Sequence, residues 1–170
     1  MGGMVSWFNA YFQSEKFVAV LGLDGAGKTA LVHRLLYGET TDPLPTMGFY
    51  IHNALVNNTV MQLADVCGQD SIRVIWTSLY HSADGIIFVI DGMDKDRLST
   101  ALMSLKEVMV YPALEDKPFL ILVNKHDEDA IDVSEIKPRI KEGNWRAFNV
   151  SVKSGDGVDE AMQWFESNFT

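Results

Sequence analysis

Residues 22–29 of this 170-residue chain read Gly22-Leu23-Asp24-Gly25-Ala26-Gly27-Lys28-Thr29. This segment fits the pattern G-x-x-x-x-G-K-[ST], and it lies between an apolar run at 17–21 and a helical pattern at 29–37. In such a segment the glycines let the backbone wrap a chain of phosphates, and N–H groups at the start of the helix bind the anion. The sequence therefore predicts a phosphate-binding loop between a buried strand and a helix.

Apolar runs and helical patterns alternate along the rest of the chain. The runs at 86–90 and 119–123 are continuous, and a shorter run covers 147–150, as in strands that are buried on both faces. Helical patterns cover 97–110 and 157–169. This alternation predicts an α/β fold with a mostly parallel sheet and helices on both of its faces.

Residues 49–66 interrupt the alternation, because they read as two strands that meet at Asn57-Asn58. Asparagine tolerates left-handed backbone conformations, so this pair suits a tight hairpin turn. We therefore expect six strands in the sheet, one of which is antiparallel to its neighbour.

Composition excludes several classes of protein. Lys and Arg number 14 against 23 Asp and Glu, so the net charge is −9, which disfavours nucleic-acid binding. Cys67 is the one cysteine, which excludes a disulfide scaffold and fits a reducing compartment without proving one. No apolar run approaches the roughly 18 residues of a transmembrane helix, and we expect no secretory signal peptide.

The phosphate-binding loop contains residues with distinct predicted roles. Lys28 would reach the β- and γ-phosphates of a nucleotide, and the Thr29 hydroxyl would bind Mg²⁺. A dinucleotide-binding loop is excluded because G-x-G-x-x-G is absent. The residues expected to contact the nucleotide here are Asp24, Gly25, Ala26, Gly27, Lys28, Thr29 and Ala30.

Two further segments are expected to approach the phosphates. At the end of the hairpin, Asp65 would bind Mg²⁺ through water, Gly68 would offer its N–H to the γ-phosphate, and Gln69 would orient the attacking water. In the segment before the hairpin, Thr46 would close over the metal and the γ-phosphate. The predicted catalytic residues are Gln69, Lys28 and Thr46, and the predicted metal ligands are Thr29, Thr46 and Asp65.

The tetrapeptide Asn124-Lys125-His126-Asp127 follows a buried strand and indicates the base. The Asp127 carboxylate can accept from both the N1–H and the exocyclic amine of guanine, a donor pair that adenine lacks. Asn124 can bond to the N7 edge of the base and to a neighbouring loop, while the stem of Lys125 covers the face of the base.

Ser151-Val152-Lys153 follows the last short strand, where the Val152 N–H could buttress the base. Together these motifs predict a domain that binds GTP or GDP. Two other classes stay open: a GTP-binding interaction module with little or no hydrolysis, and a P-loop kinase. The guanine motif and the lack of an arginine-rich lid argue against the kinase.

In this order and spacing the motifs resemble the Arf/Arl family of small GTPases over essentially the whole chain. The resemblance is carried by residues 22–29, Pro45-Thr46-Met47-Gly48-Phe49, Ile72-Arg73-x-x-Trp76 and Ser154-Gly155-Asp156-Gly157. It implies a small-GTPase fold and a switch that hydrolyses GTP slowly without an activating protein. The segment between Asp127 and Trp145 is short for the family, so we expect a trimmed helix there.

The chain also departs from the family pattern. Relatives carry Trp at the position of Ala64 and Tyr at that of Leu79, and with Phe49 these positions form an aromatic triad that reads effectors. One of the three aromatics is kept, so the family's partners cannot be copied to this chain. Cys67 replaces the first Gly of the usual Asp-x-Gly-Gly-Gln, but Gly68 is retained, so nucleotide binding should survive.

The N-terminus predicts membrane attachment. Met1-Gly2-Gly3-Met4-Val5-Ser6 fits N-myristoylation with Gly2 as acceptor, and Met4, Trp7, Phe8, Tyr11 and Phe12 share one helical face. We expect an amphipathic, myristoylated helix at 1–15 and a GTP-binding domain at 16–170.

The resemblance also implies how this helix is used. In the family the helix docks in one nucleotide state and is released to lipid in the other, because the hairpin slides along the sheet when GTP binds. The implied protein is a cytoplasmic monomer that attaches to the surface of a Golgi-type membrane and acts in vesicle traffic. An exchange factor, an activating protein and effectors would bind residues 46–80.

Overall fold

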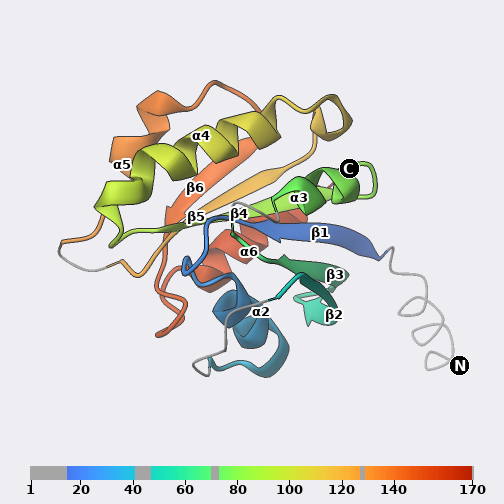
Figure 1. The fold of residues 1–170 in the computed structure, drawn as a ribbon. Helices are drawn as coiled ribbons and strands as arrows, with labels where there is room; N and C mark the ends of the chain where they lie inside the picture. Colours follow the sequence, from blue (N-terminus) through green and yellow to red (C-terminus); the bar gives the residue numbers. More distant parts are fainter. Residues whose placement is uncertain (1–14, 41–46, 70–72, 127–128, 170) are drawn as a thin grey trace, which may run out of the picture.

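The computed structural model describes residues 15–40, 47–69, 73–126 and 129–169. Within these residues, six strands form one sheet in the order β2-β3-β1-β4-β5-β6 (Figure 1). The strands are β1 (Lys16–Leu21), β2 (Phe49–Val56), β3 (Thr59–Val66), β4 (Gly85–Asp91), β5 (Phe119–Asn124) and β6 (Trp145–Asn149). The helices are α2 (Lys28–Tyr37), α3 (Val74–Leu79), α4 (Leu98–Met109), α5 (Val133–Ile136) and α6 (Val158–Ser167), with 3₁₀ turns η2 (Lys95–Arg97), η3 (Pro112–Leu114) and η4 (Lys137–Arg139).

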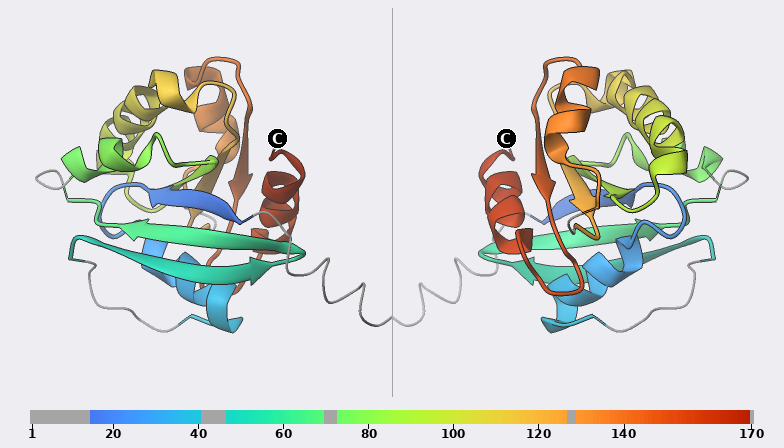
Figure 2. Two further views of the ribbon diagram at one scale, coloured as in Figure 1. Left: turned by 90° about the vertical axis from the view of Figure 1, so that its right-hand side faces the viewer. Right: turned by 90° about the vertical axis from the view of Figure 1, so that its left-hand side faces the viewer.

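The predicted hairpin is confirmed. β2 pairs antiparallel with β3, and the other neighbouring strands pair in parallel. The turn lies at Asn57-Asn58, where Asn57 adopts the expected left-handed backbone with φ of 51°. Figure 2 shows the hairpin as the outermost pair of strands, with α2 beside it.

Helices cover both faces of the sheet, so the strands are buried on both sides. In β1, Ala19 and Leu21 pack toward α3 and α4, whereas Val18 and Val20 pack toward α2 and α6 (Figure 1). This two-sided burial is the physical reason that the strand sequences read as continuous apolar runs.

The segment after β5 is trimmed, as predicted. α5 is a single turn at Val133–Ile136, and it is fixed by a capping box in which the Asp132 and Glu135 side chains bond to backbone N–H groups. Two details differ from the prediction: β6 begins at Trp145, and α3 has no counterpart among the predicted helices. In the described part of the chain, no helix combines the length and the apolar character that crossing a bilayer requires.

The parallel strands bring their carboxyl ends to one edge of the sheet. The phosphate-binding loop follows β1, residues 92–97 follow β4, and residues 125–126 follow β5. In open α/β sheets this edge is where ligands bind. The sheet therefore assembles the motifs that are separated in sequence.

Candidate functional site

The backbone of the phosphate-binding loop requires glycine at particular positions. Gly22 and Gly27 have φ of 139° and 101°, values that other residues rarely adopt. A Cβ on Gly22 would run into the carbonyl of Val89, and a Cβ on Gly27 would run into the side chain of Asn124. The loop therefore fits tightly between β4 and the end of β5.

Four consecutive carbonyl groups of the loop, those of residues 23–26, each accept a hydrogen bond from a side chain. These bonds fix the directions of the four carbonyls, and successive N–H groups of such a loop can form a concave site for an anion. The pairs are Lys28 Nζ to Leu23 O (2.7 Å), Arg97 Nη2 to Asp24 O (3.1 Å), Lys125 Nζ to Gly25 O (2.8 Å) and Asn124 Nδ2 to Ala26 O (2.9 Å).

Lys28 is a buried cation at the first position of α2, with 6% of its surface exposed. Burial removes water from the ammonium group and lowers its pKa to about 8, and the nearby Asp65 charge offsets only part of that effect. A phosphate group would supply the negative charge that the ammonium group lacks here. The position thus suits the predicted contact with the β- and γ-phosphates.

Thr29 and Asp65 bring two oxygen ligands together. The Thr29 hydroxyl donates to Asp65 Oδ2 at 2.6 Å, and Asp65 lies at the end of β3 with 1% of its surface exposed. Hydroxyl and carboxylate oxygens are ligands that Mg²⁺ accepts, and Mg²⁺ usually adds water and phosphate oxygens to complete its shell. These two residues therefore fit a magnesium site of the predicted kind.

The segment after β3 packs directly against the loop. A Cβ on Gly68 would overlap the loop backbone between Gly22 and Asp24, so only glycine fits at this position. Gln69 follows with its side chain exposed. Cys67 is buried, and its carbonyl accepts a hydrogen bond from Trp76 Nε1 at 3.2 Å, as expected of a small packed residue.

Asn124 braces two loops against each other. Its Nδ2 donates to the carbonyl of Ala26, and its Oδ1 accepts from the N–H of Val152 at 2.9 Å. The predicted bond to a neighbouring loop is confirmed, while the contact with N7 stays a prediction. The Val152 N–H donates to Asn124 in this structure, and its predicted contact with the base stays a prediction.

Arg34 of α2 bonds to the loop that contains Val152 and Lys153. Its Nε donates to the carbonyl of Val152, and its Nη2 donates to the carbonyl of Lys153 at 2.7 Å. A third bond, from Nη1, reaches the carbonyl of Gly38 at the end of α2. Arg34 could not be predicted as a site residue, because nothing in its local sequence indicates a partner 118 residues away.

The remaining predicted residues are placed as follows. Lys125 has a left-handed backbone with φ of 62°, and its ammonium group also bonds to Asp91 Oδ2 at 2.6 Å. Ala30 lies in the first turn of α2, and the N–H of Ser151 bonds to the carbonyl of Asp156. Three predicted residues lie outside the described part of the chain: Gly2, Thr46 and Asp127.

Comparisons with known proteins agree with this geometry. The sequence model of the ADP-ribosylation factor family matches residues 4–169. ADP-ribosylation factor-like protein 1 of Drosophila melanogaster is 34% identical over 98% of this chain and 97% of the fly protein. The protein of the same name from Saccharomyces cerevisiae is 35% identical over 94% of this chain and 91% of its own length.

Two solved structures share the fold. The Arl6 BBS3 small GTPase from Trypanosoma brucei, with bound nucleotide analogue GppNp, aligns with a TM-score of 0.79 at 21% identity, covering 91% of this chain and 96% of that one. The mammalian SRP receptor aligns with a TM-score of 0.78 at 22% identity, covering 90% and 100%.

Proposed function

Because the chain belongs to the ADP-ribosylation factor family and is a GTP hydrolase, we propose that it works as a nucleotide-dependent switch recruited to a Golgi-type membrane in vesicle traffic. The observation that supports the proposal is the loop of residues 22–29, in which the carbonyls of residues 23–26 accept hydrogen bonds from side chains. We infer that N–H groups of this loop bind the polyphosphate of the nucleotide. Asp127 supplies the preference for guanine.

The same residues account for hydrolysis. Thr29 and Asp65, with Thr46 in the GTP state, would hold Mg²⁺, which supplies positive charge to the β- and γ-phosphates. Lys28 binds the same phosphates, and Gln69 orients a water molecule in line with the γ-phosphorus. The water oxygen bonds to phosphorus as the bond to the β–γ bridging oxygen breaks, and one water proton passes to a phosphate oxygen. GDP leaves, with inorganic phosphate as the second product.

Slow turnover is expected because Arg97, which lies beside the loop, is already engaged by carboxylates. The guanidinium group of Arg97 is engaged by Asp24 and Asp94. A free cation for the transition state would then come from an activating protein, and such an arginine accelerates hydrolysis roughly 10³- to 10⁵-fold. The intrinsic rate of hydrolysis is then low, but the protein is still a GTPase and not only a binding module.

Replacing Gln69 with alanine should slow hydrolysis at least about 100-fold, since the attacking water loses its orientation. The affinity for GDP should change less than about threefold, because Gln69 is exposed and acts at the γ-phosphate, which GDP lacks. Single-turnover hydrolysis with and without an Arf-type activating protein measures the rate. Equal rates in wild type and variant under both conditions would contradict the role of Gln69.

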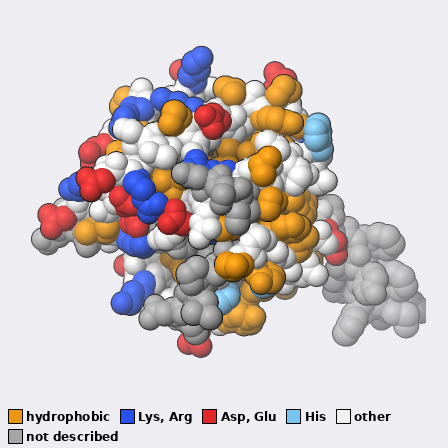
Figure 3. Space-filling view, viewed as in Figure 1, with side chains coloured by type: hydrophobic (Ala, Val, Ile, Leu, Met, Phe, Trp, Pro, Cys, Tyr) orange, Lys and Arg blue, Asp and Glu red, His pale blue; other side chains and the backbone are white. Residues whose placement is uncertain are grey.

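The partner surface differs from that of the relatives. Ala64 and Leu79, at two positions of the family's aromatic triad, are 0% and 8% exposed, whereas Phe49 is 43% exposed. Tyr50 and Ile51 extend the exposed apolar surface along β2. Figure 3 shows hydrophobic side chains gathered on the side of the molecule where α3 lies. We propose that exchange factors and effectors bind here, with a specificity of their own.

The hairpin offers a route from nucleotide to membrane. Its turn is bonded to α6, because Glu166 Oε1 accepts from the Asn58 N–H at 3.1 Å and from the Thr59 hydroxyl at 2.6 Å. We propose that GTP binding moves the hairpin and releases residues 1–15 with their myristate at Gly2. Released apolar residues need lipid, since each Å² of apolar surface left in water costs about 25 cal/mol.

The affinity of full-length, myristoylated protein for GTP should therefore be at least about tenfold higher with liposomes than without, by linkage. Deleting residues 1–14 should remove this dependence, because no helix remains to be released. Nucleotide exchange measured on both proteins, with and without liposomes, tests the coupling. Equal loading of the full-length protein in both conditions would refute it and leave the guanine-nucleotide site untouched.

A further inference from the structure

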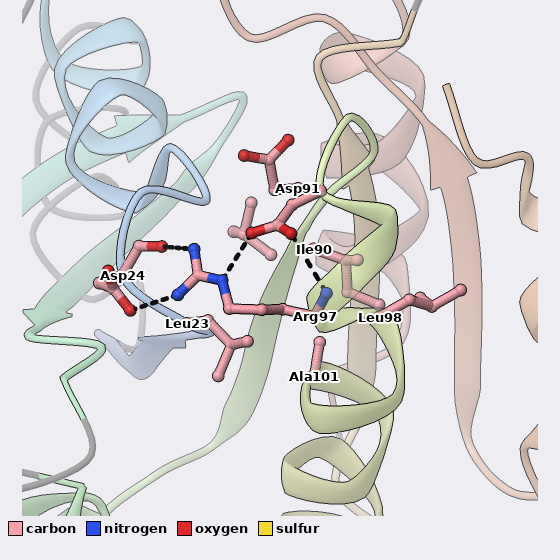
Figure 4. A pocket seen from close by; sticks show the side chains of 9 residues that line it. Leu23, Asp24, Ile90, Asp91, Arg97, Leu98 and Ala101 are labelled. Carbon is pink, nitrogen blue, oxygen red and sulfur yellow. Dashed lines mark hydrogen bonds and ion pairs between the residues drawn. The ribbon is translucent and has the colours of Figure 1, made fainter. Parts of the chain in front are cut away.

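Arg97 reaches the phosphate-binding loop from a separate element. It ends the 3₁₀ turn η2 after β4, and its Nη1 donates to Asp24 Oδ1 at 2.7 Å. Its Nη2 donates to the Asp24 carbonyl at 3.1 Å, so one guanidinium group holds both the side chain and the backbone of Asp24 (Figure 4). Such a fork of two charge-assisted bonds fixes orientation as well as charge.

The guanidinium group is itself held in place. Its Nε donates to Asp94 Oδ2 at 2.6 Å, and the Arg97 N–H donates to the other oxygen of the same carboxylate. The hydrogen bond from Arg97 is the largest influence that lowers the pKa of Asp94. Arg97 is therefore fixed between the end of β4 and the loop.

Asp24 presents an electrostatic problem in a loop built for phosphates. The Asp24 carboxylate belongs to the loop between Leu23 and Gly25, where a polyanion is expected to bind. Like charges repel each other across a few ångströms. Arg97 compensates that charge. The adjacent carbonyl of Gly25 is held in the same manner by Lys125, whose partner is Asp91 at the end of β4.

We propose that Arg97 is a positioning residue for the phosphate-binding loop. It neutralises the Asp24 carboxylate and holds the Asp24 carbonyl away from the phosphates, so that the N–H groups of the loop face GTP or GDP. The inference rests on the proposed nucleotide site. Since exposed ion pairs contribute little to folding, the effect belongs to nucleotide retention and not to stability.

A double-mutant cycle tests this role. Arg97→Gln should release fluorescent GDP about tenfold faster, because an uncompensated Asp24 then faces the phosphates. Asp24→Asn should release it more slowly than wild type. In the Asp24→Asn background, the Arg97→Gln exchange should accelerate release less than about threefold. Lys95→Gln is the matched control, because it removes the same charge from the exposed side of η2 and should change release less than about twofold.

The outcomes separate the alternatives. If Arg97→Gln accelerates release equally in wild type and in the Asp24→Asn background, or if it lowers the melting temperature of nucleotide-free protein without altering release, Arg97 is only structural and the proposal is overturned. Arg97→Lys keeps the charge without the fork and should give an intermediate rate; a rate equal to that of Arg97→Gln would refute the role of charge. If wild-type protein also fails to retain GDP, the proposed nucleotide site itself is wrong.

Discussion

Exchange of Lys28 for methionine should lower GDP affinity at least about 100-fold, because the β-phosphate loses charge-assisted hydrogen bonds that contribute about 1.5–3 kcal/mol each. The nucleotide-free domain should be at least as stable as wild type. In the free protein, burial lowers the pKa of the ammonium group from 10.5 to about 8, so its charge is disfavoured there. Titration with GDP and urea unfolding without nucleotide measure the two effects.

The pH dependence of binding supplies an independent check of the same group. A bound phosphate stabilises the charged ammonium and raises its pKa, so binding takes up a proton once the free protein has lost it. The affinity for GDP should therefore be at its maximum below pH 8, and it should fall as the pH rises above 8, by at most about tenfold per pH unit. The methionine variant should lack this decline between pH 7 and 9. A wild type whose affinity stays flat over that range would contradict the assignment.

Local sequence predicted the parts of the site whose function depends on local geometry. The loop at 22–29 needs glycines at fixed offsets after a strand, and the structure places Gly22 and Gly27 in backbone conformations that glycine adopts readily. The hairpin turn was predictable because Asn57 tolerates a left-handed conformation. In both cases the physical requirement falls on the residues that carry the pattern.

Contacts between distant segments were not predictable in this way. Arg97 lies 73 residues from Asp24, and Arg34 lies 118 residues from Val152, so neither pair leaves a local pattern. The hydrogen bond made by the Val152 N–H was not predictable for the same reason. Its partner is the Asn124 side chain, whose position depends on the pairing of β5 with β6.

The choice of base should reverse when Asp127 is replaced by asparagine. Guanine offers two donors, N1–H and the exocyclic amine, to the Asp127 carboxylate. The asparagine amide presents only one acceptor to them, together with one donor that opposes a guanine donor. With about 1.5–3 kcal/mol for each charge-assisted bond, GDP affinity should fall roughly 100- to 10 000-fold. Xanthine carries a carbonyl in place of the amine, so it offers an acceptor to the new amide donor.

The variant should therefore bind xanthosine diphosphate more tightly than GDP, whereas wild type should prefer GDP. Competition of the two nucleotides against fluorescent GDP or fluorescent xanthosine diphosphate measures the ratio for each protein. Asp129→Asn is the matched control, since it makes the same chemical change two residues away at an exposed position and should leave the preference for GDP intact. Because the phosphate contacts are the same for both nucleotides, a change in the ratio reports the base alone. Unchanged GDP affinity in Asp127→Asn would show that another group reads guanine.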